Sequence, residues 1–123
     1  MRLNLEHPSS VNFINAVSPE EIRVGKRVFR GSVIIGTQDI IPDWPVASTQ
    51  QISEHDFAPV LELEPEIVLL GTGRHLVFPG REIYGALLGR RIGLEVMDTA
   101  AACRTFNVLA GEGRMVAAGL ILD

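Results

Sequence analysis

The second half of the chain alternates fully apolar runs with amphipathic stretches, and this alternation restricts the fold more than any other feature. Residues 67–70 are apolar at every position and are followed by Gly71, which is typical of a strand covered on both faces. Residues 94–97 predict a second short strand. Residues 115–122 are apolar except for Gly119 and predict a third strand that lies centrally in a sheet. Strands that alternate with helices predict parallel pairing through right-handed crossovers.

Both stretches between these strands have the spacing of amphipathic helices. The first helix is expected to open at Pro79 and to end at Gly93. Its apolar stripe consists of Ile83, Tyr84, Leu87 and Leu88. The second helix is expected to follow an N-cap at Asp98 and Thr99 and to end at Gly111. Its apolar positions recur at spacings of three and four: Thr99, Ala102, Cys103, Phe106, Leu109 and Ala110.

The two helices are expected to cover one face of the sheet. Two glycines in the first helix, Gly85 and Gly89, weaken it by about 1 kcal/mol each, a cost that close backbone packing would explain.

The first third of the chain predicts short antiparallel strands. Within residues 11–36, apolar groups are separated by turn signals at Ser18-Pro19-Glu20, Gly25-Lys26 and Gly31-Ser32. This spacing predicts a meander with one apolar and one wetter face. The antiparallel N-terminal hairpins and the C-terminal parallel βαβαβ part, with its two covering helices, together predict an α+β protein.

The segment between these two parts is expected to be mostly irregular. Residues 37–52 show no periodicity. Ser53 and Asp56 have the spacing of a capping box that opens a short helix. Because Pro59 follows closely, this helix is expected to be limited to one or two irregular turns.

Length and composition place the chain among globular proteins. Its 123 residues, 46% of them apolar, predict a single globular domain at residues 10–123 after a loose leader at residues 1–9. The longest apolar run is too short to span a bilayer, and no secretory leader is recognisable, so no integral membrane segment and a cytoplasmic location are expected. The single cysteine, Cys103, excludes an internal disulfide, and the histidines lack metal-ligand spacing, so no metal or cofactor is expected.

Charge is unevenly distributed along the chain. Residues 31–73 contain seven acidic residues and no lysine or arginine, which argues against nucleic-acid binding. This block is either a solvated acidic face or a surface for a basic protein partner. The lone tryptophan within it either anchors the loop on the domain or serves as an exposed binding residue. The candidate partner surface consists of Asp39, Asp43, Trp44, Glu54 and Asp56.

The loops that follow the parallel strands are the second candidate site, because such loops gather at one edge of a sheet. The candidate ligand residues are Gly71, Thr72, Gly73, Arg74, Asp98, Thr99 and Asn107. Glycine amides, an arginine and a helix N-terminus suit a small anion. The alternative is a tight turn in which Arg74 pairs with a carboxylate. The dinucleotide fingerprint is not matched, because Leu76 stands where its last glycine belongs. Asn107 either bonds neighbouring backbone or lines the pocket.

Cys103 is the one nucleophile that the pattern singles out, with His75 as a conceivable base. Its position on the apolar stripe predicts instead a buried thiol that stays protonated and inert. No catalytic residue is therefore assigned.

Several of these segments resemble a known family. The run Gly71-Thr72-Gly73, then Pro79, and above all the specific block at residues 94–118 resemble a small family of domains of unknown function, and the resemblance spans nearly all of the chain. That family includes the mitochondrial complex I assembly factor three and the adipogenesis-associated domain protein. The resemblance implies a three-layer β/β/α fold in which the hairpins form a second sheet layer. Phe106 stands where relatives commonly have tyrosine, which argues against catalysis by a hydroxyl there.

The resemblance also implies a role. It favours a non-enzymatic assembly or interaction factor for respiratory complex I, whose partners are respiratory-complex subunits and which reaches the inner membrane through such a partner. The alternative function is that of a small-ligand or anion-binding protein, or an enzyme, that uses the loops after the parallel strands.

Overall fold

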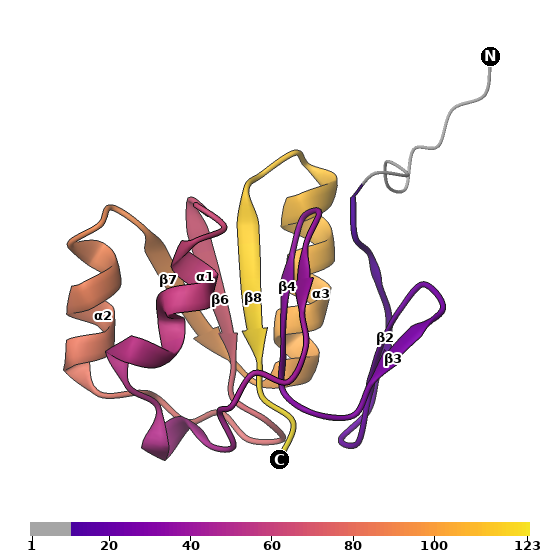
Figure 1. The fold of residues 1–123 in the computed structure, drawn as a ribbon, viewed down its shortest axis with the longest axis horizontal. Coiled ribbons are helices and arrows are strands. Elements are labelled where there is room, and N and C mark those ends of the chain that lie inside the picture. Colours follow the sequence, from indigo (N-terminus) through magenta and orange to yellow (C-terminus); the bar gives the residue numbers. More distant parts are fainter. Residues whose placement is uncertain (1–10) are drawn as a thin grey trace.

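The computed structural model describes residues 11–123, so the leader expected at residues 1–9 lies outside the described part of the chain (Figure 1). In chain order the elements are β1 (Ile14–Val17), β2 (Ile22–Val24), β3 (Arg27–Phe29), β4 (Val33–Gly36), β5 (Ile40–Ile41), the 3-10 helices η1 (Thr49–Gln51) and η2 (Glu54–Phe57), α1 (Ala58–Leu61), β6 (Ile67–Gly71), α2 (Arg81–Leu88), β7 (Gly93–Met97), α3 (Thr99–Gly111) and β8 (Val116–Leu120).

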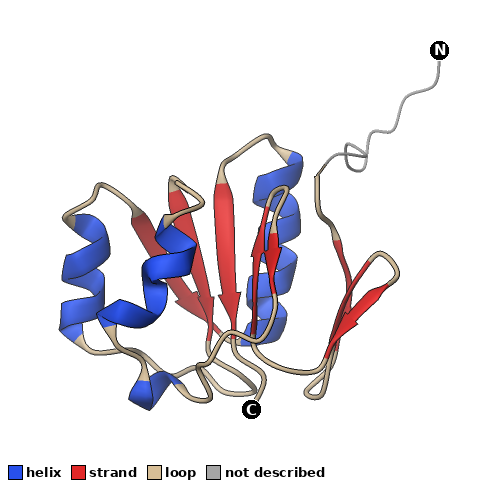
Figure 2. Cartoon of the chain, in the orientation of Figure 1, coloured by secondary structure: helices blue, strands red, loops and turns tan. Residues whose placement is uncertain are grey.

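A five-stranded sheet with the order β5-β4-β8-β6-β7 forms the centre of the molecule (Figure 2). β6 pairs in parallel with both β7 and β8, which confirms the prediction of parallel pairing. β8 is buried at all five positions, as expected for a central strand. β4 pairs antiparallel with β8 and closes the other side of the sheet together with β5.

The N-terminal meander is shorter than predicted. β1, β2 and β3 form a separate three-stranded antiparallel sheet, but β4 leaves it and joins the large sheet. The two segments differ in how many of their faces are apolar and need to be covered. Residues 33–35 are each 0% exposed and need cover on both faces, whereas Ile22, Arg23 and Val24 alternate between buried and exposed.

The two long helices lie on opposite faces of the large sheet, so the expectation that both cover one face was wrong. Ile83 and Leu87 of α2 pack in one cluster with Val68 and Leu70. Phe106 of α3 packs in the other cluster, with residues of the opposite face such as Leu69. The chain moves outward from β6 to β7 and then back across β6 to β8. Two right-handed crossovers that run in opposite directions place their helices on opposite faces.

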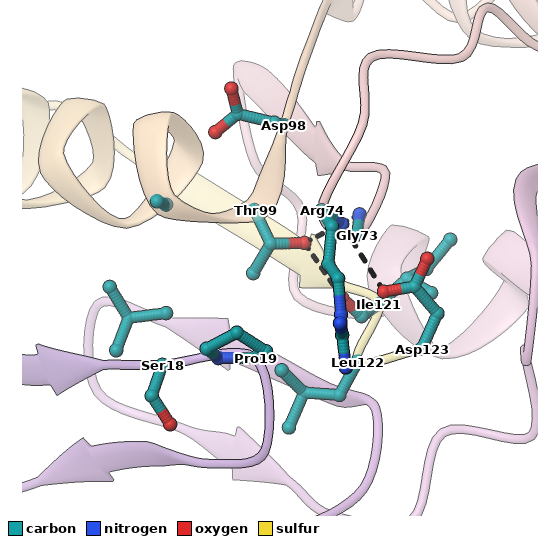
Figure 3. Close-up of a pocket in the computed structure, with 11 residues that line it drawn as sticks. Ser18, Pro19, Gly73, Arg74, Asp98, Thr99, Ile121, Leu122 and Asp123 are labelled. Atoms are coloured by element: carbon teal, nitrogen blue, oxygen red, sulfur yellow. Dashed lines mark hydrogen bonds between the residues drawn. The ribbon is translucent and has the colours of Figure 1, made fainter.

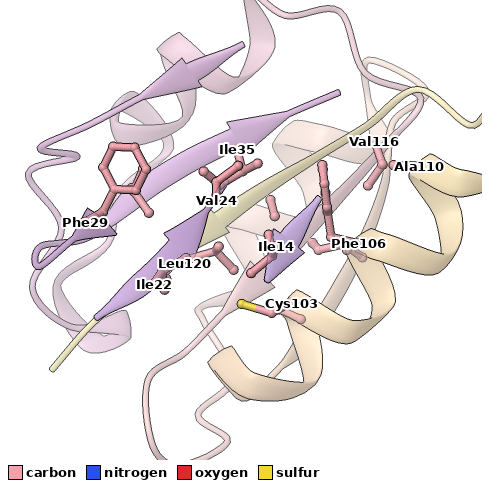
Figure 4. Packing of buried hydrophobic residues seen from close by; sticks show 14 residues of the cluster. Ile14, Ile22, Val24, Phe29, Ile35, Cys103, Phe106, Ala110, Val116 and Leu120 are labelled. Carbon is pink, nitrogen blue, oxygen red and sulfur yellow. The ribbon is translucent and has the colours of Figure 1, made fainter. Parts of the chain in front are cut away.

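The three-stranded sheet packs beside α3 on the same face of the large sheet. Ile14, Ile22 and Phe29 from the small sheet share a buried cluster with Cys103 and Phe106 (Figure 4). The three layers are thus the small sheet with α3, the large sheet, and α1 with α2. This arrangement confirms the second sheet layer that the resemblance implied.

α2 ends earlier than predicted. Its last residue is Leu88, which is 73% exposed and does not belong to a buried stripe. The chain then turns through Arg91, at a φ of 62°, and Gly93 begins β7 instead of ending the helix. A Cβ added at Gly85 would meet no atom within 4 Å, so close packing does not explain this glycine.

The short helix of the middle segment forms as predicted. Asp56 accepts a hydrogen bond from the Ser53 backbone N–H at 2.8 Å and completes a capping box at η2. One four-residue turn, α1, follows, with Pro59 in its first turn, where a missing N–H costs nothing.

Candidate functional site

The two predicted ligand loops meet at the carboxyl ends of the parallel strands. The Gly73 N–H donates to the Thr99 hydroxyl at 2.8 Å, and the Thr99 N–H donates to the Gly73 carbonyl at 2.9 Å. The same hydroxyl donates to the Ile121 carbonyl at 2.7 Å. These bonds tie together the chain segments that follow β6, β7 and β8. They lie in the interior, because Thr99 is only 4% exposed.

Glycine is required at both ends of the first loop. A Cβ at Gly71 would lie 2.9 Å from the Thr99 Cα, so only glycine allows α3 to approach this closely. Gly73 has a φ of 97°, and a Cβ there would lie 2.5 Å from a carboxylate oxygen of Asp123. These two glycines explain the glycine-rich spacing in structural terms.

A pocket of about 370 Å³ opens beside these loops (Figure 3). Four segments line it: 17–19, 73–74, 98–100 and 121–123. Gly73, Arg74, Asp98 and Thr99 were predicted from the sequence. The turn at 17–19 was missed, because it belongs to the other sheet and carries no local signal of a site.

The charges around the pocket are mixed. Arg74 forms an exposed ion pair with Glu20 at 3.9 Å. Its backbone N–H donates to Asp123 Oδ1 at 3.2 Å. Asp98 Oδ1 caps α3 by accepting from the Ala101 N–H at 2.8 Å, which confirms the predicted N-cap. The amides of Gly73 and Arg74 are thus already bonded within the chain, and any ligand anion has to compete with Asp123.

Three predicted ligand residues do not line the pocket. Gly71 serves the close approach described above. The Thr72 hydroxyl donates to the His75 carbonyl at 2.6 Å and accepts from the Val77 N–H at 3.2 Å, so it braces the loop. The Asn107 side chain accepts from the Ile14 N–H at 2.8 Å and donates to the Ile14 carbonyl at 2.9 Å. Asn107 therefore joins α3 to β1, and the backbone-bonding alternative is the correct one.

Cys103 lies in the core, as predicted. It is 2% exposed, and burial raises the pKa of its thiol to about 12. Within residues 11–123, no three His, Cys, Asp or Glu side chains gather where they could hold a metal ion.

Trp44 is buried and is not an exposed binding residue. Its side chain is 4% exposed and packs edge-to-face on Phe57, with ring centroids 6.0 Å apart. The indole N–H donates to the Asp56 carbonyl at 2.9 Å. An aromatic ring in the apolar cluster with a satisfied N–H is a loop anchor, which confirms the first of the two interpretations. The candidate partner surface therefore loses Trp44.

The remaining acidic candidates lie at two ends of the large sheet. Asp39 shares a small hollow with Met115 and Val116, where β8 begins. Asp43 is placed by its neighbour Trp44, whose backbone N–H donates to the Ser32 carbonyl. The Ser32 hydroxyl in turn accepts from the backbone N–H of Leu122, just after the end of β8. The Trp44 indole N–H also bonds the Asp56 carbonyl. Asp43 and Asp56, with Glu54 two residues earlier in η2, thus lie toward the carboxyl-end edge of the parallel strands, whereas Asp39 lies at the opposite edge.

The same carboxyl-end edge exposes two large apolar side chains that sequence reasoning missed. Leu76 is 52% exposed and Phe78 is 66% exposed, on the loop that Thr72 braces. The available signal was a short apolar run, residues 76–78, inside a loop bounded by His75 and Pro79. We call residues 76–78 the apolar tip.

Comparisons with known proteins agree on one family. The family described as "Protein of unknown function (DUF498/DUF598)" matches residues 14–121. The mouse protein named NADH dehydrogenase [ubiquinone] 1 alpha subcomplex assembly factor 3 is 38% identical over 122 residues, which cover 97% of this chain. The chain spans 64% of the length of that relative.

Solved structures share the whole fold. The solution structure of a Xanthomonas campestris protein is 40% identical, with a TM-score of 0.82 over 99% of this chain and 92% of that chain. The crystal structure of a Bordetella parapertussis protein is 33% identical, with a TM-score of 0.86 over 94% of this chain and 100% of that chain. Among the helices of residues 11–123, none has the length and apolar character needed to cross a bilayer.

Proposed function

Because the chain belongs to the family of proteins of unknown function DUF498/DUF598, we propose that it is a non-enzymatic factor that binds protein subunits during assembly of respiratory complex I. The proposal is supported by the mouse relative, which is named as an assembly factor of that complex and aligns with 97% of this chain. A role in assembly requires a surface that recognises unassembled subunits. The structure offers one candidate for this surface.

The observation that carries the proposal is the exposed apolar tip. Leu76 and Phe78 are exposed on a loop whose backbone the buried Thr72 hydroxyl holds at His75 and Val77. A pre-formed loop loses little conformational entropy on binding, and buried aromatic side chains often dominate interface energies. Phe78 thus takes the anchor role that the sequence suggested for Trp44.

The acidic residues near the apolar tip indicate which charge the partner surface should carry. Asp43 and Glu54 are exposed at the same edge of the sheet as the apolar tip. Asp56 lies there too, but its carboxylate is used by the capping box. An apolar tip near acidic residues fits a partner groove that is apolar inside and basic at its rim. Binding to subunits of the membrane-bound complex would bring the chain to the inner membrane through its partner.

Deleting the gene in its host tests the role itself. We expect the deletion to reduce mature complex I on native gels, and re-expression of the wild-type chain to restore it. Unchanged amounts of assembled complex I in the deletion strain would contradict the proposal.

Affinity capture with quantification of complex I subunits tests the surface. Asp43→Asn combined with Glu54→Gln should reduce capture at low salt and flatten its salt dependence, because charge steering is screened by ions. Asp39→Asn, at the opposite edge of the sheet, is the matched control and should have no effect.

Phe78→Ser should reduce capture of the same subunits more strongly than the charge changes. Leu88→Ser is its control, because Leu88 is equally apolar and 73% exposed but lies outside the apolar tip. Equal capture by Phe78→Ser and wild type would place the partner surface elsewhere.

A further inference from the structure

We propose that the pocket beside Arg74 binds a small carboxylic acid with an apolar body, and that Asp123 occupies the carboxylate position until such a ligand displaces it. This inference does not rest on the assembly role. It concerns the 370 Å³ pocket at the carboxyl ends of the parallel strands (Figure 3).

The structure already holds a carboxylate at this place. The Arg74 N–H donates to Asp123 Oδ1, and Gly73 permits the approach because a Cβ there would lie 2.5 Å from the Asp123 carboxylate. The hydrogen bond measures 3.2 Å, which is long for a charged acceptor. Asp123 is exposed, so water can replace this bond readily. A ligand carboxylate that displaces Asp123 enters without adding charge next to Arg74.

The Arg74 guanidinium supplies the second contact. Its side chain extends along the pocket toward Pro19 and Leu122 (Figure 3). Its ion pair with Glu20 is 3.9 Å long, and the two side chains are 54% and 77% exposed. Such a pair contributes little stability, so the guanidinium is free to turn to a ligand.

Apolar side chains from three segments form the rest of the pocket. Val17 and Pro19 come from the small sheet, Ala100 from α3, and Ile121 and Leu122 from the end of β8. These walls favour a hydrocarbon body and offer nothing to a compact, strongly hydrated anion such as phosphate.

Nearby acidic groups also disfavour a dianion. Asp98, Asp123 and Glu20 all lie close to the pocket or to Arg74. The Asp98 carboxylate caps α3 and points away from the Arg74 guanidinium (Figure 3). A monocarboxylate replaces the single negative charge of the displaced Asp123 side chain, whereas a dianion would add a further negative charge beside Asp98 and Glu20.

Amide spectra of the ¹⁵N-labelled full chain, titrated with hexanoate, hexylamine and inorganic phosphate, test the proposal. Hexanoate should move the amide signals of Gly73, Arg74, Thr99 and Leu122 together at millimolar concentration. Hexylamine and phosphate should not move this set. Absence of the hexanoate response, or an equal response to hexylamine, overturns the proposal.

Two variants separate the contacts. Arg74→Gln should weaken hexanoate binding by roughly tenfold or more, since a charge-assisted contact is lost. Arg81→Gln is the matched control, because Arg81 is an exposed arginine outside the pocket lining. Both variants should keep the wild-type pattern of amide signals away from the pocket.

Asp123→Asn gives the decisive result. Removing the competing carboxylate should tighten hexanoate binding by roughly threefold to tenfold. Unchanged or weaker binding by Asp123→Asn overturns the displacement mechanism, because a merely structural Asp123 would not oppose the ligand. None of these outcomes bears on complex I assembly, which is tested separately by the gene deletion.

Discussion

Cys103 illustrates how the position of one side chain decides its chemistry. A thiol is reactive as a thiolate, and a thiolate needs solvent or a nearby positive charge. Cys103 lies instead among Ala102, Phe106 and the buried residues of the small sheet. Burial raises the pKa of its thiol to about 12, so it is a packing residue at neutral pH.

This pKa predicts a specific loss of stability at high pH. In the unfolded chain the thiol ionises near its ordinary pKa of 9.0, whereas in the folded chain it ionises at about 12. The folded state therefore retains a proton that the unfolded state releases above pH 9.0. The corresponding stabilisation is complete below that pH and is lost, by at most roughly 1.4 kcal/mol per pH unit, as the pH rises.

Urea unfolding of wild type and Cys103→Ala at neutral pH and at several values above 9.0 measures this effect. The variant is expected to be less stable at neutral pH, and the difference between the two proteins should shrink as the pH rises. A difference that stays constant with pH would show that Cys103 is accessible to ionisation in the folded state.

At the scale of single elements, one glycine in β8 is required by packing, whereas one glycine in α2 is not. Gly119 is the fourth of the five residues of β8, and a Cβ there would lie 2.7 Å from the Trp44 ring. Gly85 lies in α2 with nothing within 4 Å of its missing Cβ. The first glycine makes room for the loop anchor on the sheet, and the second serves no packing contact.

Alanine substitutions should therefore shift stability in opposite directions. Gly119→Ala should lower the free energy of unfolding by roughly 1–3 kcal/mol, because the Trp44 ring must move out of a packed cluster. Gly85→Ala should raise it by roughly 0.5–1 kcal/mol through helix propensity alone. Urea denaturation of both variants checks the pair, and a stable Gly119→Ala protein would mean that the loop carrying Trp44 adjusts at no cost.

At the scale of the whole molecule, the small sheet is held to the rest through few polar contacts. Asn107 joins α3 to Ile14 of β1 by two hydrogen bonds, and Asn12, just before β1, bonds backbone carbonyls of residues 36–39. An exposed ion pair joins Glu20 to Arg74, and apolar packing against α3 and the large sheet attaches the small sheet further. The five-stranded sheet has its own continuous ladder of backbone hydrogen bonds. The two sheets are therefore expected to differ in local stability.

Asn107→Ala should loosen the small sheet selectively. Loss of both hydrogen bonds leaves the Ile14 N–H and carbonyl without partners, at a cost of roughly 1–3 kcal/mol. Native-state hydrogen exchange should become faster in β1 and β2, while amides of β6 and β8 keep their protection. Uniform acceleration over both sheets would indicate that the molecule opens as one cooperative unit.

Much of the architecture was readable from the chain because its signals are local. The apolar runs at 67–70 and 115–122 and the spacing of Ala102, Cys103 and Phe106 predicted β6, β8 and α3, since periodicity depends only on neighbours in the sequence. Parallel strands also implied that the loops at 71–74 and 98–99 meet, and they do.

Tertiary structure decided everything that depends on which distant segments pair. In the strand order β8-β6-β7, the crossover from β7 to β8 runs in the opposite direction to the crossover from β6 to β7, so α2 and α3 lie on opposite faces of the sheet. Nothing in either helix sequence indicates which face that helix will cover. Trp44 is buried because Gly119, seventy-five positions away, leaves space for its ring. The pocket gains its far walls from segments 17–19 and 121–123, brought there by the packing of two sheets. By itself the sequence determined the elements and their periodicity; their neighbours, and with them the site, followed from long-range packing that no local pattern contains.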